Sequence, residues 1–225
     1  MERRPPGELV YLDRKRRLSI FEVDGQSHKL YCQNLCLLGK LFLDHKTLYF
    51  DVSPFLFYVL AEEDATGVHL MGYFSQERLM THDFNLACIA VLPPFQRRGL
   101  GKLLIAMSYA LAKKRGRVCT PEKPLSDMGK VGYKSYWTDT LFEALLAIKR
   151  ERYAWDTCTV EELSAATGIQ PADIIETLTG HGLLRYLKGQ HVLNTSAMSV
   201  RVIEDHFSRQ KEAQARFETR YLLDK

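Results

Sequence analysis

The sequence predicts an α/β (α+β) fold, with a mixed sheet in a central core and a helix-turn-helix region with a wing toward the C-terminus. Two observations carry this prediction. Apolar runs typical of strands alternate with helical patterns, and a glycine-containing loop joins the run Leu86–Leu92 to the helical pattern Leu103–Ala112. Helix start and stop signals follow one another beyond Thr159. We therefore expect two regions, residues 1–137 and 138–225.

Composition excludes several classes of protein. The 225 residues are 46% hydrophobic, which fits one large domain or a core with a small appendage. No apolar stretch approaches the roughly 18 residues that span a bilayer, and Met1–Pro6 lacks the pattern of a signal peptide, so we expect no membrane association. Five cysteines, mostly inside apolar segments, favour a reducing compartment such as the cytosol or nucleus. The net charge of +4 does not by itself indicate nucleic-acid binding.

The first elements are predicted from turn chemistry and periodicity. Leu18–Val23 and Lys29–Tyr31 have the pattern of two strands around the tight turn Asp24-Gly25, because Asp-Gly supplies the backbone angles that hairpins need. A helix is expected over Gln33–Phe42, where leucines recur with a period of 3.6 residues.

The next elements build the core. Phe55–Ala61 and Val68–Phe74 are predicted to be strands on either side of a polar turn. Asn85–Leu92 has the uninterrupted apolar pattern of a fully buried central strand. A helix over Gly101–Arg115 should follow the glycine loop.

Beyond Trp137 the pattern becomes helical. Residues 138–152 are expected to be helical, Thr159 and Glu162 have the spacing of a capping box, and Gly168 should end that helix. Pro171 suits the first position of the next helix, Ala172–Thr179.

A hairpin of Leu183–Leu187 and His191–Leu193 should form a wing, and residues 200–225 are expected to be a charged helix. The second helix of the helix-turn-helix carries Asp173 and Glu176 and no lysine or arginine. This charge is unfavourable in a DNA groove, so the helix is predicted to pack or to bind a partner.

The glycine loop is the candidate binding site for a phosphate group. Glycines let a backbone approach an anion closely, and the start of a helix favours negative charge. The loop has neither the ending of a P-loop nor the spacing of a dinucleotide fingerprint, and a simple tight turn is the alternative interpretation. It comprises Gln96, Arg97, Arg98, Gly99, Leu100, Gly101 and Lys102.

Six segments, in order and at family spacing, resemble the MYST family of lysine acetyltransferases. They are Tyr31–Leu38, Lys40–Tyr49, Pro54–Tyr58, Gly72–Ser75, Pro93–Gly99 and Thr120–Asp127. The resemblance extends from about Pro5 to about Leu193 and implies a histone or protein lysine N-acetyltransferase that uses acetyl-CoA. It also implies an acetyltransferase-type mixed sheet, with an acetyl-CoA-binding catalytic core in residues 1–137 and a winged-helix-like region in residues 138–225.

Acetyl transfer to lysine requires a base, because the ammonium form of lysine, with a pKa near 10.4, dominates at pH 7 by about 4.6 kcal/mol. By resemblance, Glu122 is the general base and Cys88 lies in the active site. Two mechanisms remain open: Cys88 could accept the acetyl group first, or lysine could attack acetyl-CoA directly with Glu122 as base. Direct attack is favoured, because it needs no ionised thiol in an apolar strand.

The resemblance also assigns the contacts to acetyl-CoA. The strand edge would meet the pantetheine and acetyl carbonyl, the glycine loop would hold the pyrophosphate, and two serines complete the set: Ile89, Ala90, Val91, residues 96–102, Ser126 and Ser135. Ser126 is also a candidate N-cap of the helix after it. Lys46 aligns with the lysine that the family autoacetylates, although an ordinary exposed lysine fits that position equally well.

Departures from the family concern zinc. Its catalytic domains usually carry a Cys/His zinc finger just before the Pro5-Pro6-Gly7 segment, and this sequence begins four residues earlier. Cys32 and Cys36 are one helical turn apart, but a structural zinc needs four ligands, so we expect core cysteines and no metal in this chain.

The implied partners belong to chromatin. Histone-tail lysines are the expected substrates, subunits of a chromatin-modifying complex the expected partners, and the nucleus the expected location. The basic N-terminal residues, among them Arg14 and Arg17, could contact nucleosomal DNA, although charge runs are more often solvated surface. A catalytically weak or inactive scaffold that binds complex subunits is the alternative function.

Overall fold

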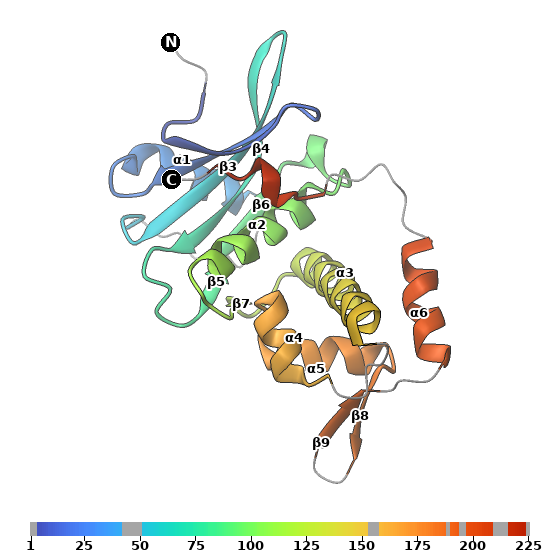
Figure 1. Cartoon of the computed structure of the whole chain (residues 1–225). Coiled ribbons are helices and arrows are strands. Elements are labelled where there is room, and N and C mark those ends of the chain that lie inside the picture. Colours follow the sequence, from blue (N-terminus) through green and yellow to red (C-terminus); the bar gives the residue numbers. More distant parts are fainter. Residues whose placement is uncertain are drawn as a thin grey trace.

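A computed structural model gives the arrangement of the chain (Figure 1). It describes residues 4–41, 51–152, 158–187, 190–193, 197–208 and 216–223. Strands and helices together form the mixed α/β architecture that the sequence predicts.

The main sheet is antiparallel and has the strand order β1-β2-β3-β4-β6. Its strands are β1 (Glu8–Asp13), β2 (Leu18–Asp24), β3 (Phe55–Asp64), β4 (Gly67–Glu77) and β6 (Cys88–Val91). Both faces are covered, because alternate residues of a strand point to opposite sides. On one face Tyr58 and Leu60 pack against α2 (Leu100–Lys114), and on the other Phe57 and Val59 pack near α1 (Lys29–Lys40).

Most expectations for the first elements are confirmed, and one of them is wrong. The β3–β4 hairpin and α2 lie where the sequence predicts them. The predicted strand Lys29–Tyr31 is instead the first turn of α1. Strand β2 is paired along one edge with β1 and along the other with β3. No edge of β2 is therefore left for the residues that follow Asp24-Gly25 to form a hairpin strand. Strand β1, which periodicity did not reveal, takes that position.

The predicted central strand Asn85–Leu92 is divided in two, which corrects that expectation. Its first part, β5 (Phe84–Leu86), pairs in parallel with β7 (Thr120–Pro121). Its second part, β6, pairs with β4 and lies at the edge of the main sheet. Cys88 is therefore half-buried and not enclosed in a central strand.

Helix α3 (Asp127–Arg152) begins eleven residues before the predicted position and runs through the expected boundary at residue 137. Its side chains Tyr133 and Trp137 join Tyr109 of α2 in one hydrophobic cluster, which also contains Leu163 and Ile174 from the second region. Trp137 Nε1 donates to Tyr109 Oη at 2.8 Å. The division into residues 1–137 and 138–225 stays a prediction, but the two parts share a core.

The helix signals after residue 158 are confirmed. Helix α4 (Val160–Thr167) has the full capping box of Thr159 and Glu162 and ends at Gly168 in the left-handed region, with φ 76°. Helix α5 (Pro171–Gly180) begins at Pro171. Strands β8 (Leu184–Leu187) and β9 (Gln190–Leu193) form the expected hairpin, which projects from the helices in Figure 1.

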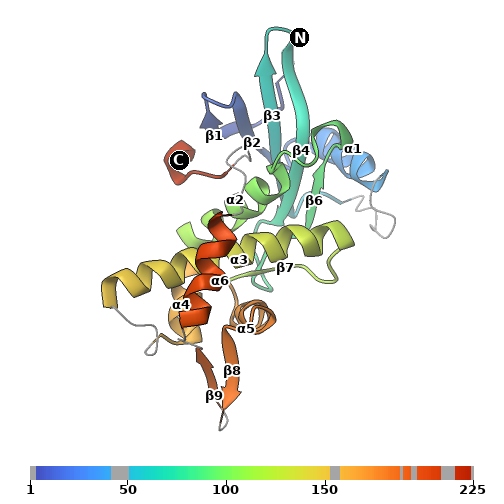
Figure 2. The same ribbon diagram turned by 90° about the vertical axis from the view of Figure 1, so that its right-hand side faces the viewer.

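The end of the chain differs from the single charged helix predicted for residues 200–225. Helix α6 (Ala197–Ser208) places Ile203 in the cluster around α3. Residues 216–223 contain the short 3₁₀ helix η2 (Thr219–Tyr221) and lie along β1, where Leu223 N donates to Val10 O at 2.9 Å. The C-terminal segment thus ends beside the main sheet, as Figures 1 and 2 show. Among the described residues, no helix has both the length and the apolarity needed to cross a membrane.

Candidate active site

Cys88 lies at the point where the chain passes from one sheet to the other. The preceding strand β5 pairs with β7, whereas Cys88 itself pairs with Ser75 of β4. Its sulfur is 3.9 Å from the hydroxyl oxygen of Tyr73, a contact in which either group can donate. Burial raises the pKa of Tyr73 far above its usual range, and the neighbouring Cys88 adds to the shift. Tyr73 is thus a neutral hydroxyl beside the candidate thiol.

Glu122 follows β7 directly, and its side chain is exposed. Its backbone N–H donates to Leu86 O at 2.9 Å, which extends the parallel pairing of β5 and β7 by one residue. Because Leu86 precedes Cys88 by two residues, Glu122 and Cys88 follow the carboxyl ends of two adjacent parallel strands. The fold therefore brings both predicted residues to the same end of the β5–β7 pair.

The segment bearing Glu122 is also tied to α5. Thr120 and Lys123, on either side of Glu122, both donate to the buried carboxylate of Asp173. No local sequence pattern predicts this contact, because the partners lie about fifty residues apart. The only sequence signal at Asp173 is a charge that is unfavourable for DNA binding.

Strand β6 offers a free edge in the part of the chain that the structure describes. Leu92 N donates to Met71 O at 2.9 Å toward β4, so alternation along an antiparallel strand directs the peptide groups of Val91 and Ile89 to the other side. Gln96 Nε2 donates to Val91 O at 3.0 Å on that free side. The edge formed by Ile89, Ala90 and Val91 could thus hold an extended ligand with amide groups.

The glycine loop joins this edge to the start of α2 through the 3₁₀ helix η1 (Pro93–Phe95). Gly99 is the N-cap of α2 and has a φ of 81°, in the left-handed region. The first intrahelical donor is Leu103 N, which bonds Gly99 O at 3.0 Å. The N–H groups of Leu100, Gly101 and Lys102 precede it, so they have no partner within the helix and, with the helix dipole, suit an anion.

Only one cation of this loop has no acidic partner among the described residues. Arg98 pairs with Glu62 at 3.1 Å, and Lys102 pairs with Asp139 and donates to Ser135 Oγ at 3.3 Å. Arg97, with a φ of 61°, is exposed and forms no ion pair within the described part of the chain. Lys102 therefore points toward α3 in this structure, although it was predicted to face a phosphate.

The remaining predicted residues have varied positions. Ser126 Oγ accepts from Gly129 N at 3.1 Å, which is the predicted N-cap role at the start of α3. Lys46 lies outside the described residues. Cys32 and Cys36 are buried in the cluster between α1 and the sheet, as core cysteines would be. Within the described ranges, no cluster of three or more histidine, cysteine or acidic side chains could hold a metal ion.

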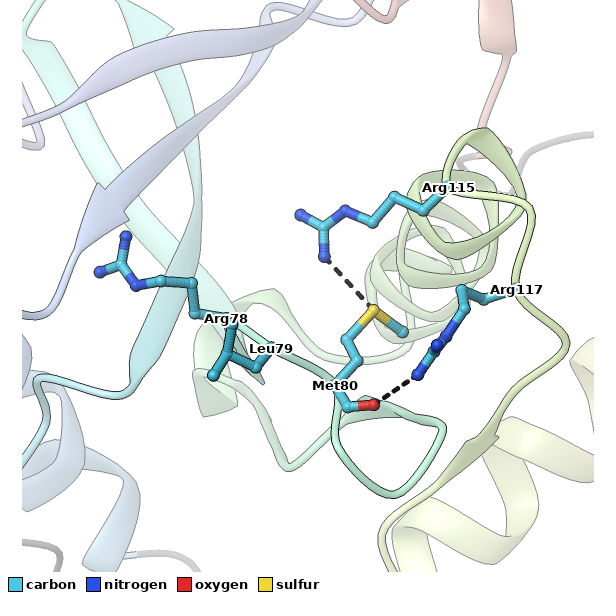
Figure 3. Close-up of a pocket in the computed structure, with 5 residues that line it drawn as sticks. All are labelled: Arg78, Leu79, Met80, Arg115 and Arg117. Carbon is cyan, nitrogen blue, oxygen red and sulfur yellow. Dashed lines mark hydrogen bonds between the residues drawn. The ribbon is translucent and has the colours of Figure 1, made fainter.

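A cavity of about 260 Å³ lies near the amino-terminal ends of β5 and β7, away from Glu122 and Cys88 (Figure 3). It is lined by Arg78, Leu79, Met80, Arg115 and Arg117. Arg117 Nη2 donates to Met80 O at 2.7 Å and pairs with Asp83 at 2.9 Å, while Arg78 pairs with Asp24 at 2.7 Å. The Arg117 contacts fasten the loop before β5 to the segment before β7, and the Arg78 pair ties the chain after β4 to the end of β2. No predicted site residue lines the cavity.

Comparisons with known proteins show which sequences this chain is similar to. The profile of the MOZ/SAS family matches residues 4–222. The chain is 48% identical over 223 residues to the histone acetyltransferase MOF of Drosophila melanogaster, covering 98% of this chain and 26% of the relative. It is 48% identical over 208 residues to the histone acetyltransferase Tip60 homolog of Caenorhabditis elegans, covering 92% of this chain and 45% of the relative.

A plant relative gives similar values. The histone acetyltransferase of the MYST family 1 from Arabidopsis thaliana is 53% identical over 189 residues, which cover 84% of this chain and 41% of the relative. The chain thus spans less than half of the length of each of these relatives.

Proposed function

The chain belongs to the MOZ/SAS family, and on this premise we propose that it transfers an acetyl group from acetyl-CoA to the side-chain amine of a protein lysine. The observation that carries the proposal is the position of Glu122 and Cys88. They follow two adjacent parallel strands, and Cys88 begins the strand whose free edge leads into the anion-binding start of α2.

Glu122 is proposed as the general base. The exposed carboxylate can accept a proton from a lysine ammonium group and leave the nitrogen lone pair free to attack. Bound acetyl-CoA supplies the acetyl carbonyl carbon, to which the lysine nitrogen bonds while the carbon–sulfur bond breaks and the thiolate departs. The attacking nitrogen loses a second proton as the amide forms, and this proton goes to the departing thiolate. The proton that Glu122 has taken is released to solvent, so charge and atoms balance.

The residues proposed to hold acetyl-CoA fit its chemistry. The free edge at Ile89 and Val91 suits an amide-containing pantetheine arm, and the unpartnered N–H groups at the start of α2 suit a pyrophosphate. Arg97 is the cation available to that group, while Lys102 would have to leave Asp139 to reach it. Ser126 and Ser135 stay proposed contacts.

Cys88 is proposed to shape the site without carrying the acetyl group. It is half-buried and lies against a neutral hydroxyl, and no cation contacts its sulfur among the described residues. Direct attack by lysine needs no ionised thiol, so Cys88 does not have to act as a nucleophile.

Histones are proposed as substrates because the relatives are named histone acetyltransferases. Subunits of a chromatin-modifying complex as partners, the nucleus as location, and Lys46 as a site of autoacetylation are proposed from the resemblance of the sequence motifs. Helices α4 and α5 with the β8–β9 hairpin are proposed as a winged-helix-like unit. Nucleosomal DNA could meet Arg14 and Arg17, which are exposed in the turn between β1 and β2. A scaffold without activity is the second candidate.

Replacement of Glu122 by glutamine tests the function. The variant keeps the shape of the side chain but cannot take a proton, so acetyl transfer to a histone-tail peptide should fall roughly 10² to 10⁴-fold. Transfer of labelled acetyl groups from acetyl-CoA is the measurement. Glu176→Gln is the matched control, because Glu176 is an exposed carboxylate of α5 away from the site.

Two outcomes would contradict the proposal in different ways. An unaltered chain that binds acetyl-CoA tightly but transfers nothing would favour the scaffold. Full activity of Glu122→Gln would remove Glu122 from the mechanism while leaving the acetyltransferase function in place.

A further inference from the structure

Asp173 is a buried carboxylate that the proposed chemistry does not use. It lies in the first turn of α5, and its side chain is only 1% exposed. Thr120 Oγ1 donates to its Oδ2 at 2.7 Å and Lys123 Nζ donates to its Oδ1 at 2.9 Å. Both carboxylate oxygens are thus occupied by side chains from one short segment, residues 120–123, which contains Glu122.

The charge of Asp173 is stabilised where it lies. A buried carboxylate is costly unless it is paired and hydrogen-bonded, and here an ammonium group, a hydroxyl and the positive end of a helix all face it. The Lys123 side chain is half exposed, so it covers the Asp173 carboxylate on the side that faces solvent. The contact with Thr120 is buried on the inner side. The carboxylate therefore holds one residue on each side of Glu122, Thr120 and Lys123, at fixed positions relative to α5.

Backbone pairing reinforces the same junction. Cys119 N donates to Gly168 O at 2.8 Å, and Gln170 N donates to Cys119 O at 3.2 Å. On the opposite side, Glu122 N donates to Leu86 O. The Glu122 segment thus lies between β5, which leads to Cys88, and the α4–α5 connection.

We propose that Asp173 is a positioning residue for acetyl transfer, which clamps Thr120 and Lys123 so that the carboxylate of Glu122 is presented beside the end of β5. The proposal rests on the proposed function of Glu122. It gives α5 a role in the reaction, although this helix belongs to the C-terminal region and contributes no predicted contact to acetyl-CoA. Proton transfer depends steeply on position, so loosening this segment should lower the turnover rate.

The test replaces Asp173 by asparagine, which keeps an acceptor for Thr120 but removes the charge that holds Lys123. We expect kcat for acetylation of a histone-tail peptide to fall by about 10 to 100-fold, with the KM for acetyl-CoA unchanged. Glu176→Gln, one turn along the same helix, removes the same charge from an exposed position and should leave both constants unchanged. Thr120→Val should act like Asp173→Asn, whereas Thr120→Ser, which keeps the donor, should retain activity.

A double-mutant cycle separates positioning from general damage. If Asp173 acts through Glu122, Asp173→Asn should cost far less in the Glu122→Gln background than in the unaltered chain. A purely structural defect would lower the rate by the same factor in both backgrounds, and that result would overturn the inference.

Hydrogen exchange gives a readout that does not need activity. The amides of Cys119, Thr120 and Glu122 are bonded to Gly168, Asp83 and Leu86 respectively. Asp173→Asn should speed exchange in residues 119–123, and Glu176→Gln should not. Unchanged exchange would overturn the inference even if the unaltered chain proved inactive, an outcome that would sink the proposed function separately. An active chain in which Asp173→Asn leaves kcat unchanged would overturn the inference alone.

Discussion

The five cysteines of the chain differ in their surroundings, although none of them forms a disulfide. Cys32 and Cys119 are buried, and loss of hydration raises the pKa of Cys32 to about 12 and that of Cys119 to about 11. At pH 8 the thiolate fraction of Cys32 is then about one in 10⁴. Cys88 alone is half-buried, at the edge of the main sheet. Reactivity should follow this difference in access.

We expect Cys88 to react first with an alkylating reagent in the native chain at pH 8. The rate at each cysteine can be followed by mass spectrometry of peptides, with Cys88→Ala as the control that removes the fast phase. The buried thiols should react faster as the pH rises toward their pKa values, because the thiolate is the reactive form. Equal labelling of Cys88 and Cys32 would mean that Cys88 is less accessible than the fold indicates.

At this scale the sequence could predict residues that belong to contiguous motifs, and not their distant partners. Glu122, Cys88 and the glycine loop were recognised from local segments. Tyr73 beside Cys88, Asp173 beside Thr120 and Asp139 beside Lys102 depend on contacts across 15, 53 and 37 positions. Hydrogen bonds between side chains so far apart are set by packing, which no local pattern contains.

At the scale of elements, helix ends were predictable and strand partners were not. The capping box at Thr159 and the stop at Gly168 act within four residues of the helix end, so sequence alone locates them. An apolar run such as Leu86–Leu92 shows that a segment is buried, but not which strand it pairs with. Division of that run between β5 and β6 depends on β7, which lies about thirty residues later. For this reason the sequence could not predict that Cys88 lies at the edge of the main sheet.

At the start of α2, two glycines of the same loop differ in backbone conformation. Gly99 has a φ of 81°, where an L-residue is strained. Gly101 lies within the helix, and the nearest atom to a Cβ added there would be Val91 Cγ2, at 3.9 Å. Gly99→Ala should lower the free energy of unfolding by roughly 1–2 kcal/mol. Gly101→Ala should be neutral or raise it by up to about 1 kcal/mol. Urea unfolding of the two variants measures the difference, and equal losses would show that the loop geometry is wrong.

At the scale of the whole molecule, distant parts of the chain complete one another. Residues 216–223 lie along β1, where Tyr11 Oη is buried and the ring stacks on Phe217 at 5.3 Å between centroids. Tyr221 contacts the same ring edge-on at 5.9 Å. Arg16 pairs with both Asp13 and Glu218, so the C-terminal segment also closes the turn after β1. The cluster around α2 and α3 joins the two predicted regions in the same way.

This arrangement predicts cooperative unfolding of the chain as one unit. Phe217→Ala should lower the free energy of unfolding by about 1–3 kcal/mol, because it uncovers Tyr11 and removes aromatic stacking from a half-buried site. Tryptophan fluorescence reports, through Trp137, on the core around α3, whereas far-UV circular dichroism reports on strands and helices together. Since α3 crosses the expected boundary and its core includes side chains of α2, α4 and α5, both signals should shift to lower denaturant together. Separate transitions, with the fluorescence change unaffected by Phe217→Ala, would instead show that the main sheet and the core shared by α2, α3, α4 and α5 unfold independently.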